Sequence, residues 1–229
     1  MPGAAHDGIG LMAEVNLLAR LPRTKRNLAQ RKQAQTPKNI EIARQYGELY
    51  FDGPRGVGYG GYHYDGRWIP IAEDIVRHFH LKPGDRVLDV GCAKGFLVKD
   101  LMKVCPGLEA FGIDVSEYAL MHSEPEVVGR LHLGSADRLP FPDHSFSAVI
   151  SINTIHNFGR ENAMRAVREV ERLAPGRGFI QVDSYRTPEQ RELFLNWVLT
   201  AKFHDYPKGW IKLFQDAGYT GDWYWTILE

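Results

Sequence analysis

Arg86-Val-Leu-Asp-Val-Gly-Cys-Ala-Lys-Gly95 is the stretch of sequence that decides the fold. It begins with four residues, Arg86–Asp89, that suit a buried strand, and small residues follow at positions 91, 93 and 95. Phe96–Leu101 then has helical character. A strand, a loop of small residues and a helix start form a corner where a ligand can approach the backbone and meet free N–H groups. The alternative is an ordinary strand–turn–helix corner.

Beyond this corner, predicted strands and helices alternate. The predicted strands are Arg86–Val90, Glu109–Asp114, Gly129–Leu133, Ala148–Ile152, Gly178–Asp183 and Trp223–Leu228, and the helices between them include Phe96–Val104, Glu117–His122 and Glu161–Leu173. Alternation of this kind implies right-handed crossovers and a doubly wound, mostly parallel sheet. We therefore predict an α/β fold with six or seven strands, Val198–Phe203 being the candidate for the seventh.

Composition limits the class of protein. The chain has 229 residues with 44% hydrophobic content, enough for one α/β domain with an appendage. The formal net charge is zero, which argues against a general affinity for nucleic acid or an anionic membrane. Two cysteines cannot form a disulfide framework, and no metal-ligand spacing, spanning segment or signal peptide is visible. We expect a cytoplasmic, soluble protein without a metal.

The first third of the chain is predicted to be an appendage. Residues 1–67 are expected to form a helical cap and a lid, and residues 68–229 the ligand-binding domain. Apolar residues at helical spacing predict a short amphipathic helix over Leu11–Leu21, and Thr36-Pro37 is typical of a helix start, with the helix running to about Leu49. A homodimer could form through these helices.

Positive charge gathers near this appendage. Eight Lys or Arg residues lie between Arg20 and Arg44, against Glu41 alone. One interpretation is an arm that binds RNA or phosphate, and the other is a solvated helical face or a partly disordered arm. No aromatic residue interleaves the basic ones before Tyr46, which weakens the case for stacking on single-stranded RNA.

Glycines and large rings alternate in Phe51–Trp68. A segment so rich in glycine does not hold a regular element, yet it carries three tyrosines, a histidine and a tryptophan. This combination predicts a mobile lid that packs its rings on a ligand. The alternative is a loop whose rings only anchor it to the core.

Four motifs, in order, resemble those of the class I methyltransferases that use S-adenosylmethionine. The pattern D-x-G-x-A-x-G over Asp89–Gly95 is similar to their first motif, whereas dinucleotide enzymes usually show G-x-G-x-x-G. Phe111–Ser116 places an acid at a strand end, and Leu133–Phe146 resembles G-D-A-x-x-L-P-F-x-D-x-S-F-D. Ser151–Phe158 resembles the end of strand four in small-molecule methyltransferases. Alanine at position 93 departs from the family's glycine.

The resemblance implies S-adenosylmethionine as cofactor and S-adenosylhomocysteine as product. It implies that Asp114 holds the ribose hydroxyls, that Asp137 meets the adenine amino group, and that backbone near Ser151 receives the methionine amino group. The cofactor residues expected from it, together with the lid, are Asp89, Gly91, Cys92, Ala93, Gly95, Asp114, Val115, Ala136, Asp137, Arg138, Ser151, Asn153 and Tyr59.

The sequence says less about the residues that bind the methyl acceptor. His156 follows strand four and is the candidate catalytic base, or a histidine hydrogen-bonded only within its loop. The candidate residues for binding the acceptor are Tyr62, Tyr64, Arg67, Asn157, Tyr185 and Arg186. Alignment of acceptor, methyl and sulfur needs few side chains, because the sulfonium is already a strong methyl donor.

Missing motifs favour a small acceptor. The strand-four loop is neither N-P-P-Y nor D-P-P-Y, it has no Pro-Cys pair, and no paired-glutamate hairpin is present. We therefore predict methyl transfer to an O or N atom of a small polar metabolite, with a weak likeness to enzymes of bacterial polysaccharide and secondary-metabolite pathways. An RNA methyltransferase using the basic arm, and a non-catalytic binding or assembly protein with this fold, remain the alternatives.

Overall fold

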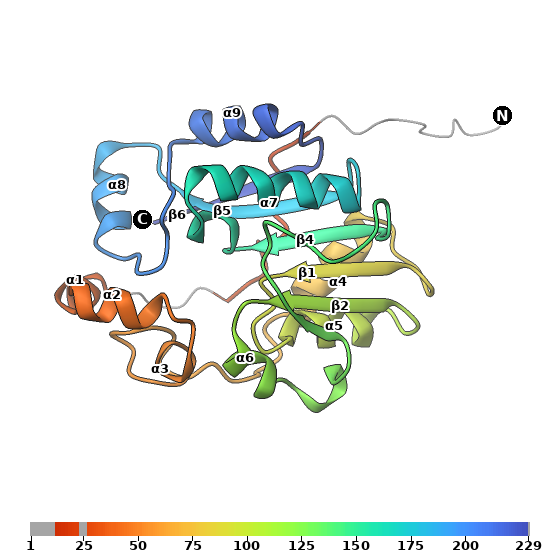
Figure 1. Cartoon of the computed structure of the whole chain (residues 1–229), viewed down its shortest axis with the longest axis horizontal. Helices are drawn as coiled ribbons and strands as arrows, with labels where there is room; N and C mark the ends of the chain where they lie inside the picture. Colours follow the sequence, from red (N-terminus) through yellow and green to blue (C-terminus); the bar gives the residue numbers. More distant parts are fainter. Residues whose placement is uncertain (1–11, 23–26, 229) are drawn as a thin grey trace.

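The computed structural model describes residues 12–22 and 27–228, and within them it contains a six-stranded sheet (Figure 1). The strands are β1 (Arg86–Val90), β2 (Glu109–Asp114), β3 (Leu131–Leu133), β4 (Ala148–Ile152), β5 (Gly178–Ser184) and β6 (Asp222–Ile227). Their order is β3-β2-β1-β4-β5-β6, and every neighbouring pair is parallel. The predicted doubly wound α/β fold is confirmed.

Helices cover both faces of the sheet (Figure 1). The helices of the sheet-forming part are α4 (Ile69–His78), α5 (Phe96–Val104), α6 (Glu117–Met121), α7 (Arg160–Leu173), α8 (Pro188–Leu195) and α9 (Pro207–Ala217). Helices α4 and α5 pack together on one face, and α7 and α9 pack together on the other. Of the helices in the described part of the chain, none combines the length and the apolar character that crossing a membrane requires.

Alternation along each strand divides the interior into two cores. In β4, Val149 packs with the α7–α9 side, whereas Ala148 and Ile150 pack with the α4–α5 side. In β5, Ile180 and Phe179 divide in the same way. Successive side chains of a strand point to opposite faces, so each central strand supplies apolar side chains to both cores.

One strand, not two, follows β5 in the described part of the chain. Val198–Phe203 forms irregular backbone, and the N–H groups of Lys202 and Phe203 donate to the carbonyl of His156 at 2.9 and 3.1 Å. The candidate seventh strand is therefore a loop fixed against the loop after β4. β6 occupies the edge beside β5.

The predicted amphipathic helix at Leu11–Leu21 is wrong for the described residues of that range, and Leu11 lies outside them. Ala13–Val15 runs beside β6, where the N–H of Val15 donates to the carbonyl of Trp223 at 2.9 Å and the N–H of Trp223 donates to Ala13 at 3.1 Å. Leu17 is buried in the α4–α5 core. Pairing with an open sheet edge overrides helical spacing, and it covers part of that edge. The homodimer predicted through the N-terminal helices stays a prediction.

The predicted helix from Thr36 to about Leu49 is broken in the middle. The structure has α1 (Leu28–Ala34), α2 (Pro37–Ala43) and the short α3 (Glu48–Phe51). Thr36 caps α2 as predicted. Tyr46 then adopts a left-handed conformation, with φ of 52°, which ends the helical path and turns α3 away.

A glycine in β2 gives a direct test of the packing between sheet and loop. A Cβ at Gly112 would lie 2.6 Å from Cys92 Sγ and 2.8 Å from a methyl carbon of Leu131. We predict that Gly112→Ala lowers the free energy of unfolding by about 1–3 kcal/mol, because a close-packed site must shift to accept the methyl group. Urea unfolding measures the change. Gly47→Ala, where a Cβ meets open space, is the control. Equal midpoints for the two variants would contradict this packing.

Candidate active site

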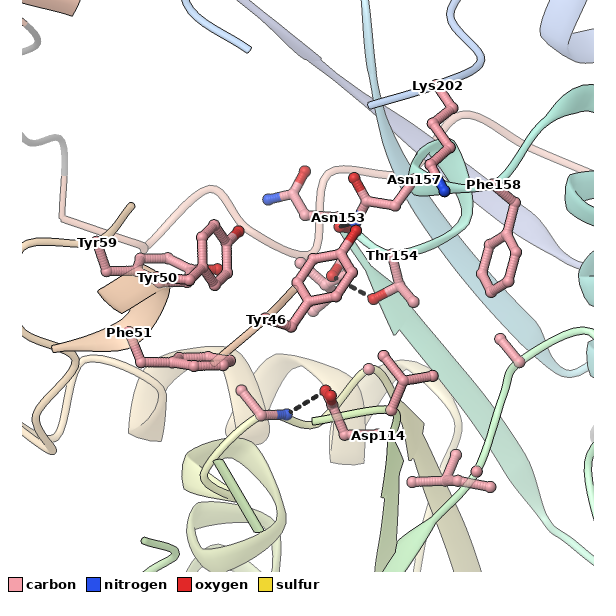
Figure 2. A pocket seen from close by; sticks show the side chains of 17 residues that line it. Tyr46, Tyr50, Phe51, Tyr59, Asp114, Asn153, Thr154, Asn157, Phe158 and Lys202 are labelled. Atoms are coloured by element: carbon pink, nitrogen blue, oxygen red, sulfur yellow. Dashed lines mark hydrogen bonds between the residues drawn. The ribbon is translucent and has the colours of Figure 1, made fainter. Parts of the chain in front are cut away.

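Two adjoining cavities open at the carboxyl ends of β1, β2 and β4, where the strand order reverses. The larger encloses about 870 Å³, solvent at its mouth included. It is lined by Tyr46, Tyr50, Phe51, Tyr59, Gly91, Ala93, Ile113, Asp114, Val115, Gly134, Ala136, Ile152, Asn153, Thr154, Asn157, Phe158 and Lys202 (Figure 2). The smaller shares five of these residues and adds Tyr62, Trp68, Asp89, Cys92 and Leu97.

The loop after β1 separates the two cavities. Gly91 has a φ of 83°, and a Cβ there would lie 1.9 Å from Thr154 Oγ1, so only glycine fits. Ala93 is also left-handed, with a φ of 49°, which an alanine adopts at a cost in energy. These two conformations place the backbone of the loop at the cavity wall. The small residues at 91 and 93 therefore allow a ligand to approach this backbone closely.

Asp114 closes the loop at the end of β2. Its Oδ2 accepts the N–H of Ala93 at 2.8 Å (Figure 2). Its Oδ1 accepts the N–H of Ser116 at 2.8 Å. Burial raises the pKa of this carboxyl, although the backbone hydrogen bonds oppose the shift. The carboxylate thus ties two loops together and still lines the larger cavity.

Asp89 is the second acid of the site, and it is only 5% exposed. Burial, and then the charge of Asp114, raise the pKa of Asp89 to about 8. Within residues 12–22 and 27–228 we find no hydrogen bond or ion pair to its carboxylate, which lines the smaller cavity beside Tyr62 and Trp68. A buried carboxyl group without a partner is suited to binding a cationic ligand, because a nearby positive charge stabilises the carboxylate.

An ion pair fastens the appendage to the loop after β1. Lys94, 5% exposed, places its Nζ 2.7 and 2.9 Å from the two oxygens of Asp52, which follows α3. Asp52 also accepts the Tyr118 hydroxyl at 2.7 Å and the N–H of Tyr62 at 3.0 Å. Burial would raise the pKa of Asp52, but these hydrogen bonds outweigh it and lower the pKa to about 2.

Aromatic rings from the appendage form one wall of the larger cavity. Tyr50 contacts Tyr46 edge-on at 5.4 Å between ring centroids, and Phe51 stacks on Tyr59 at 5.8 Å. The carbonyl of Tyr46 accepts the hydroxyl of Ser116 at 2.5 Å. Figure 2 shows these rings opposite Asp114. The rings of the predicted lid therefore line the cavity as well as pack on one another.

Most of the predicted cofactor residues line one cavity or both. They are Tyr59, Asp89, Gly91, Cys92, Ala93, Asp114, Val115, Ala136 and Asn153. Four others lie outside the lining, namely Gly95, Asp137, Arg138 and Ser151. Gly95 turns the chain into α5, Asp137 accepts the Ser135 hydroxyl at 2.5 Å, and Ser151 is buried within the sheet.

The structure brings two of the six predicted acceptor residues to the cavities, Tyr62 to the smaller and Asn157 to the larger. The other four are engaged elsewhere. Tyr64 donates to Asp100 at 2.6 Å, Arg67 pairs with Asp65, Tyr185 contacts His204 at 2.9 Å, and Arg186 pairs with Glu14 at 3.1 Å. Each of these four side chains has a hydrogen-bond or ion-pair partner outside the cavities.

His156 does not line either cavity. It is 3% exposed, and its Nδ1 accepts the N–H of Asp183 at 3.1 Å. Burial lowers the pKa of His156, and the charge of Asp183, with Oδ2 3.9 Å from Nε2, opposes the shift only in part. The arrangement matches a histidine that orders its own loop, so it lends no support to a general base at this position.

The sequence prediction missed several residues of the cavity wall. Tyr46 comes from the break between α2 and α3, Tyr50 and Phe51 come from α3, and Lys202 comes from the loop before α9. The cluster of rings at 46, 50 and 51 is visible in the sequence and could have been added to the lid. Lys202 has no local signal, because only the contact of its loop with His156 brings it there.

Two of the basic residues near the N-terminus are engaged by other parts of the chain, whereas Lys32 and Lys38 are exposed. Arg20 pairs with Glu73 and Asp74 at 2.9 and 2.8 Å. Arg31 donates to backbone carbonyls of the 55–58 loop and lies over the ring of Trp197. Positions 23, 25 and 26 are outside the described residues. Those engaged side chains hold α1 and α4 in place.

An all-parallel α/β sheet with acids at the ends of β1 and β2 defines the fold of the class I methyltransferases. The same fold is found in a chain of the complex between the Haloferax volcanii Trm112 methyltransferase activator and its methyltransferase. That comparison has a TM-score of 0.52 at 16% identity, and it covers 86% of this chain and 77% of that one. The likeness at this identity concerns the fold.

Sequence comparison points to the same class. Residues 88–182 match the family described as methyltransferase domain, which supports S-adenosylmethionine as the cofactor. A demethylmenaquinone methyltransferase of Symbiobacterium thermophilum is 33% identical over 128 residues, which are 52% of this chain and 50% of that protein. A sterol 24-C-methyltransferase of Gibberella zeae is 33% identical over 117 residues, 44% of this chain and 30% of that protein. The chain thus spans half of these relatives' length or less.

The residues present fit the cofactor. A buried carboxylate with no partner among the described residues, Asp89, suits the ammonium of a methionine group, and the Asp114 carboxylate lines a cavity where hydroxyls can donate to it. Gly91 lines both cavities and has no side chain to stand between the loop backbone and a ligand. These features lie at the strand ends where ligands of doubly wound sheets bind.

The Asp52–Lys94 pair predicts an acid-sensitive contribution to stability. Because the folded-state pKa of Asp52 is lowered to about 2 from 3.8, its contribution is present above pH 3.8 and is lost as pH falls toward 2. We predict that Asp52→Asn lowers the free energy of unfolding by about 2 kcal/mol at pH 6, and that the difference shrinks below pH 4.

Urea unfolding at a series of pH values measures this effect. Asp65→Asn is the matched control, because Asp65 forms an exposed pair with Arg67 that is worth less than about 1 kcal/mol. If wild type and Asp52→Asn kept a constant difference between pH 6 and pH 2, the ion pair would not be the source.

Proposed function

We propose that the protein transfers a methyl group from S-adenosylmethionine to an O or N atom of a small polar molecule. The observation that carries the proposal is the placing of Asp89 and Asp114 at adjacent strand ends, each on a cavity that the appendage walls with aromatic rings. The methyltransferase domain matched over residues 88–182 supports the same reaction.

The two cavities would divide the cofactor between them. Asp114 would accept the ribose hydroxyls in the larger cavity, with the adenine beside Val115 and Ala136. Asp89 would pair with the methionine ammonium in the smaller cavity, near Tyr62. The backbone between Gly91 and Ala93 lines both and would pass beside the sulfur.

The chain's own contribution to the reaction is alignment and exclusion of water. When bound, S-adenosylmethionine supplies a methyl group on a positively charged sulfur. Tyr46, Tyr50 and Asn153 would hold an acceptor opposite the loop after β1, and the wall of rings would keep bulk water from the line of transfer. Only an acceptor of high pKa needs a base, and His156 lies outside the cavities.

The shape of the larger cavity favours a small acceptor over RNA. Its outer wall is made by α3 and the loop that follows, which Lys94 and Ser116 fasten to the domain. Three of the basic residues that could have bound phosphates, Arg20, Arg31 and Arg44, donate to groups within the chain.

The first test of the proposal is binding of S-adenosylmethionine and S-adenosylhomocysteine, measured by calorimetry. Asp114→Asn should weaken S-adenosylmethionine binding by about 10- to 100-fold, since a hydrogen bond to a charged group is worth about 1.5–3 kcal/mol. Lys208→Met, at an exposed position outside both cavities, should bind as wild type does. Absence of binding by the wild type would refute the function.

The pKa of Asp89 gives a second prediction. With a pKa of about 8, Asp89 is protonated at pH 7 in the free protein and must lose its proton to pair with an ammonium. We predict that affinity for S-adenosylmethionine rises between pH 6 and 8 by up to about tenfold per unit and then levels off. Calorimetry in buffers of different ionisation enthalpy should show one proton released. Asp89→Asn should bind weakly and lose this dependence, and a wild-type affinity independent of pH would assign the ammonium elsewhere.

A further inference from the structure

A lysine stands at the mouth of the larger cavity. Lys202 lies in the loop before α9, and the two N–H groups of Lys202 and Phe203 donate to the same carbonyl, that of His156. These bonds fix the base of the side chain against the loop after β4. Figure 2 shows Lys202 on the same side of the cavity as Asn157 and Phe158, which also line it. Backbone hydrogen bonds thus set the position of Lys202, and its side chain is exposed, so a ligand can contact it.

The charge of Lys202 is not balanced within the part of the chain that the structure describes. We find no ion pair or side-chain hydrogen bond to its ammonium there, whereas Lys94, Lys99 and Lys212 each pair with a carboxylate. Asp183, the acid at the end of β5, has its Oδ2 3.9 Å from His156 Nε2. A cation on a cavity wall attracts an anionic group of whatever enters.

Asn157 offers a second recognition point next to Lys202. Its Nδ2 donates one hydrogen bond to the carbonyl of Asn153 at 3.2 Å. Its Oδ1 is buried and has no hydrogen-bond partner among the described residues. An unpaired buried acceptor costs about 1–3 kcal/mol, so a donor that reaches it from a ligand is favoured. An O–H or N–H group supplies that donor.

The walls between these polar groups are flat rings. Tyr46 and Phe158 both line the cavity, and Figure 2 shows the Tyr46 ring between Asp114 and the two asparagines. Aromatic side chains of this kind pack well on another ring. A planar acceptor would therefore lie against Tyr46 while its polar groups face Lys202 and Asn157.

We propose that the acceptor class is an aromatic acid with a hydroxyl or amino group, bound through its anionic group by Lys202 and through its O–H or N–H by Asn157. The inference rests on the proposed function and narrows its substrate. For a hydroxyl acceptor, the oxygen takes the methyl group from the sulfonium, the sulfur keeps the electron pair of the broken bond, and the hydroxyl proton passes to water. Lys202 and Asn157 are specificity residues in this scheme.

The experiment uses the full chain loaded with S-adenosylhomocysteine, so that cofactor binding is measured before the acceptor is added. The probes are 3- and 4-hydroxybenzoate and 3- and 4-aminobenzoate, each compared with the uncharged amide of the same ring. Affinities are measured by calorimetry, and methyl transfer from S-adenosylmethionine is followed for every probe. We expect at least one acid to bind about five- to tenfold more tightly than its amide, consistent with one partly exposed ion pair.

Substitutions of Lys202 test whether this lysine causes the preference for the acid over its amide. Lys202→Met should remove the preference for the acid and leave the affinity for S-adenosylhomocysteine unchanged, and Lys202→Arg should keep the preference. Lys208→Met is the control for loss of one positive charge from the same region.

The outcomes separate the two proposals. If S-adenosylhomocysteine fails to bind, the proposed function itself fails. If it binds but no acid is preferred over its amide, or if the preference survives in Lys202→Met, the acceptor class proposed here is wrong while the methyltransferase function stands.

Discussion

The site depends on the parallel pairing of β1 with β2 on one side and β4 on the other. Parallel strands bring their carboxyl ends to one edge of the sheet. The backbone hydrogen bonds between β1 and its two neighbours fix the register of the three strands, and so the relative positions of their ends. Asp89 and Gly112 are paired in this register, so the acids at 89 and 114 come close although 25 positions separate them in sequence. The reversal of strand order between β1 and β4 opens the crevice that these acids face.

The appendage becomes part of the site through one buried charge pair. Two ions leave water when Asp52 and Lys94 meet, and that loss is offset only because Tyr118 and the N–H of Tyr62 complete the hydrogen bonding of the carboxylate. Directional bonding of this kind selects one docking position for α3. The rings that depend on this position, Tyr50 and Phe51, then stand where they wall the larger cavity.

The parts of the site that could be predicted from the sequence are those that depend on residues close together in the chain. The acids at the ends of β1 and β2 and the glycine at 91 each follow from strand, loop and helix signals in the neighbouring residues. Tyr46 was missed because its left-handed backbone, with φ of 52°, breaks a helix whose start signal was correct. The strand-like segment at Ala13–Val15 and the position of Lys202 depend on Trp223 and His156, which are far away in the chain. Non-local contacts of this kind leave no pattern to find.

Cys92 shows what the closeness of loop and ligand demands of the protein. Its thiol lines the smaller cavity, where a sulfonium ligand would place a strong alkylating agent close to a sulfur nucleophile. Burial, reinforced by the negative charges of Asp89 and Asp114, raises the pKa of this thiol well above its usual range. The proton therefore stays on sulfur, and the thiolate that would attack the methyl group is not formed. A thiol held in this protonated form is a poor nucleophile toward any methyl donor that enters the smaller cavity.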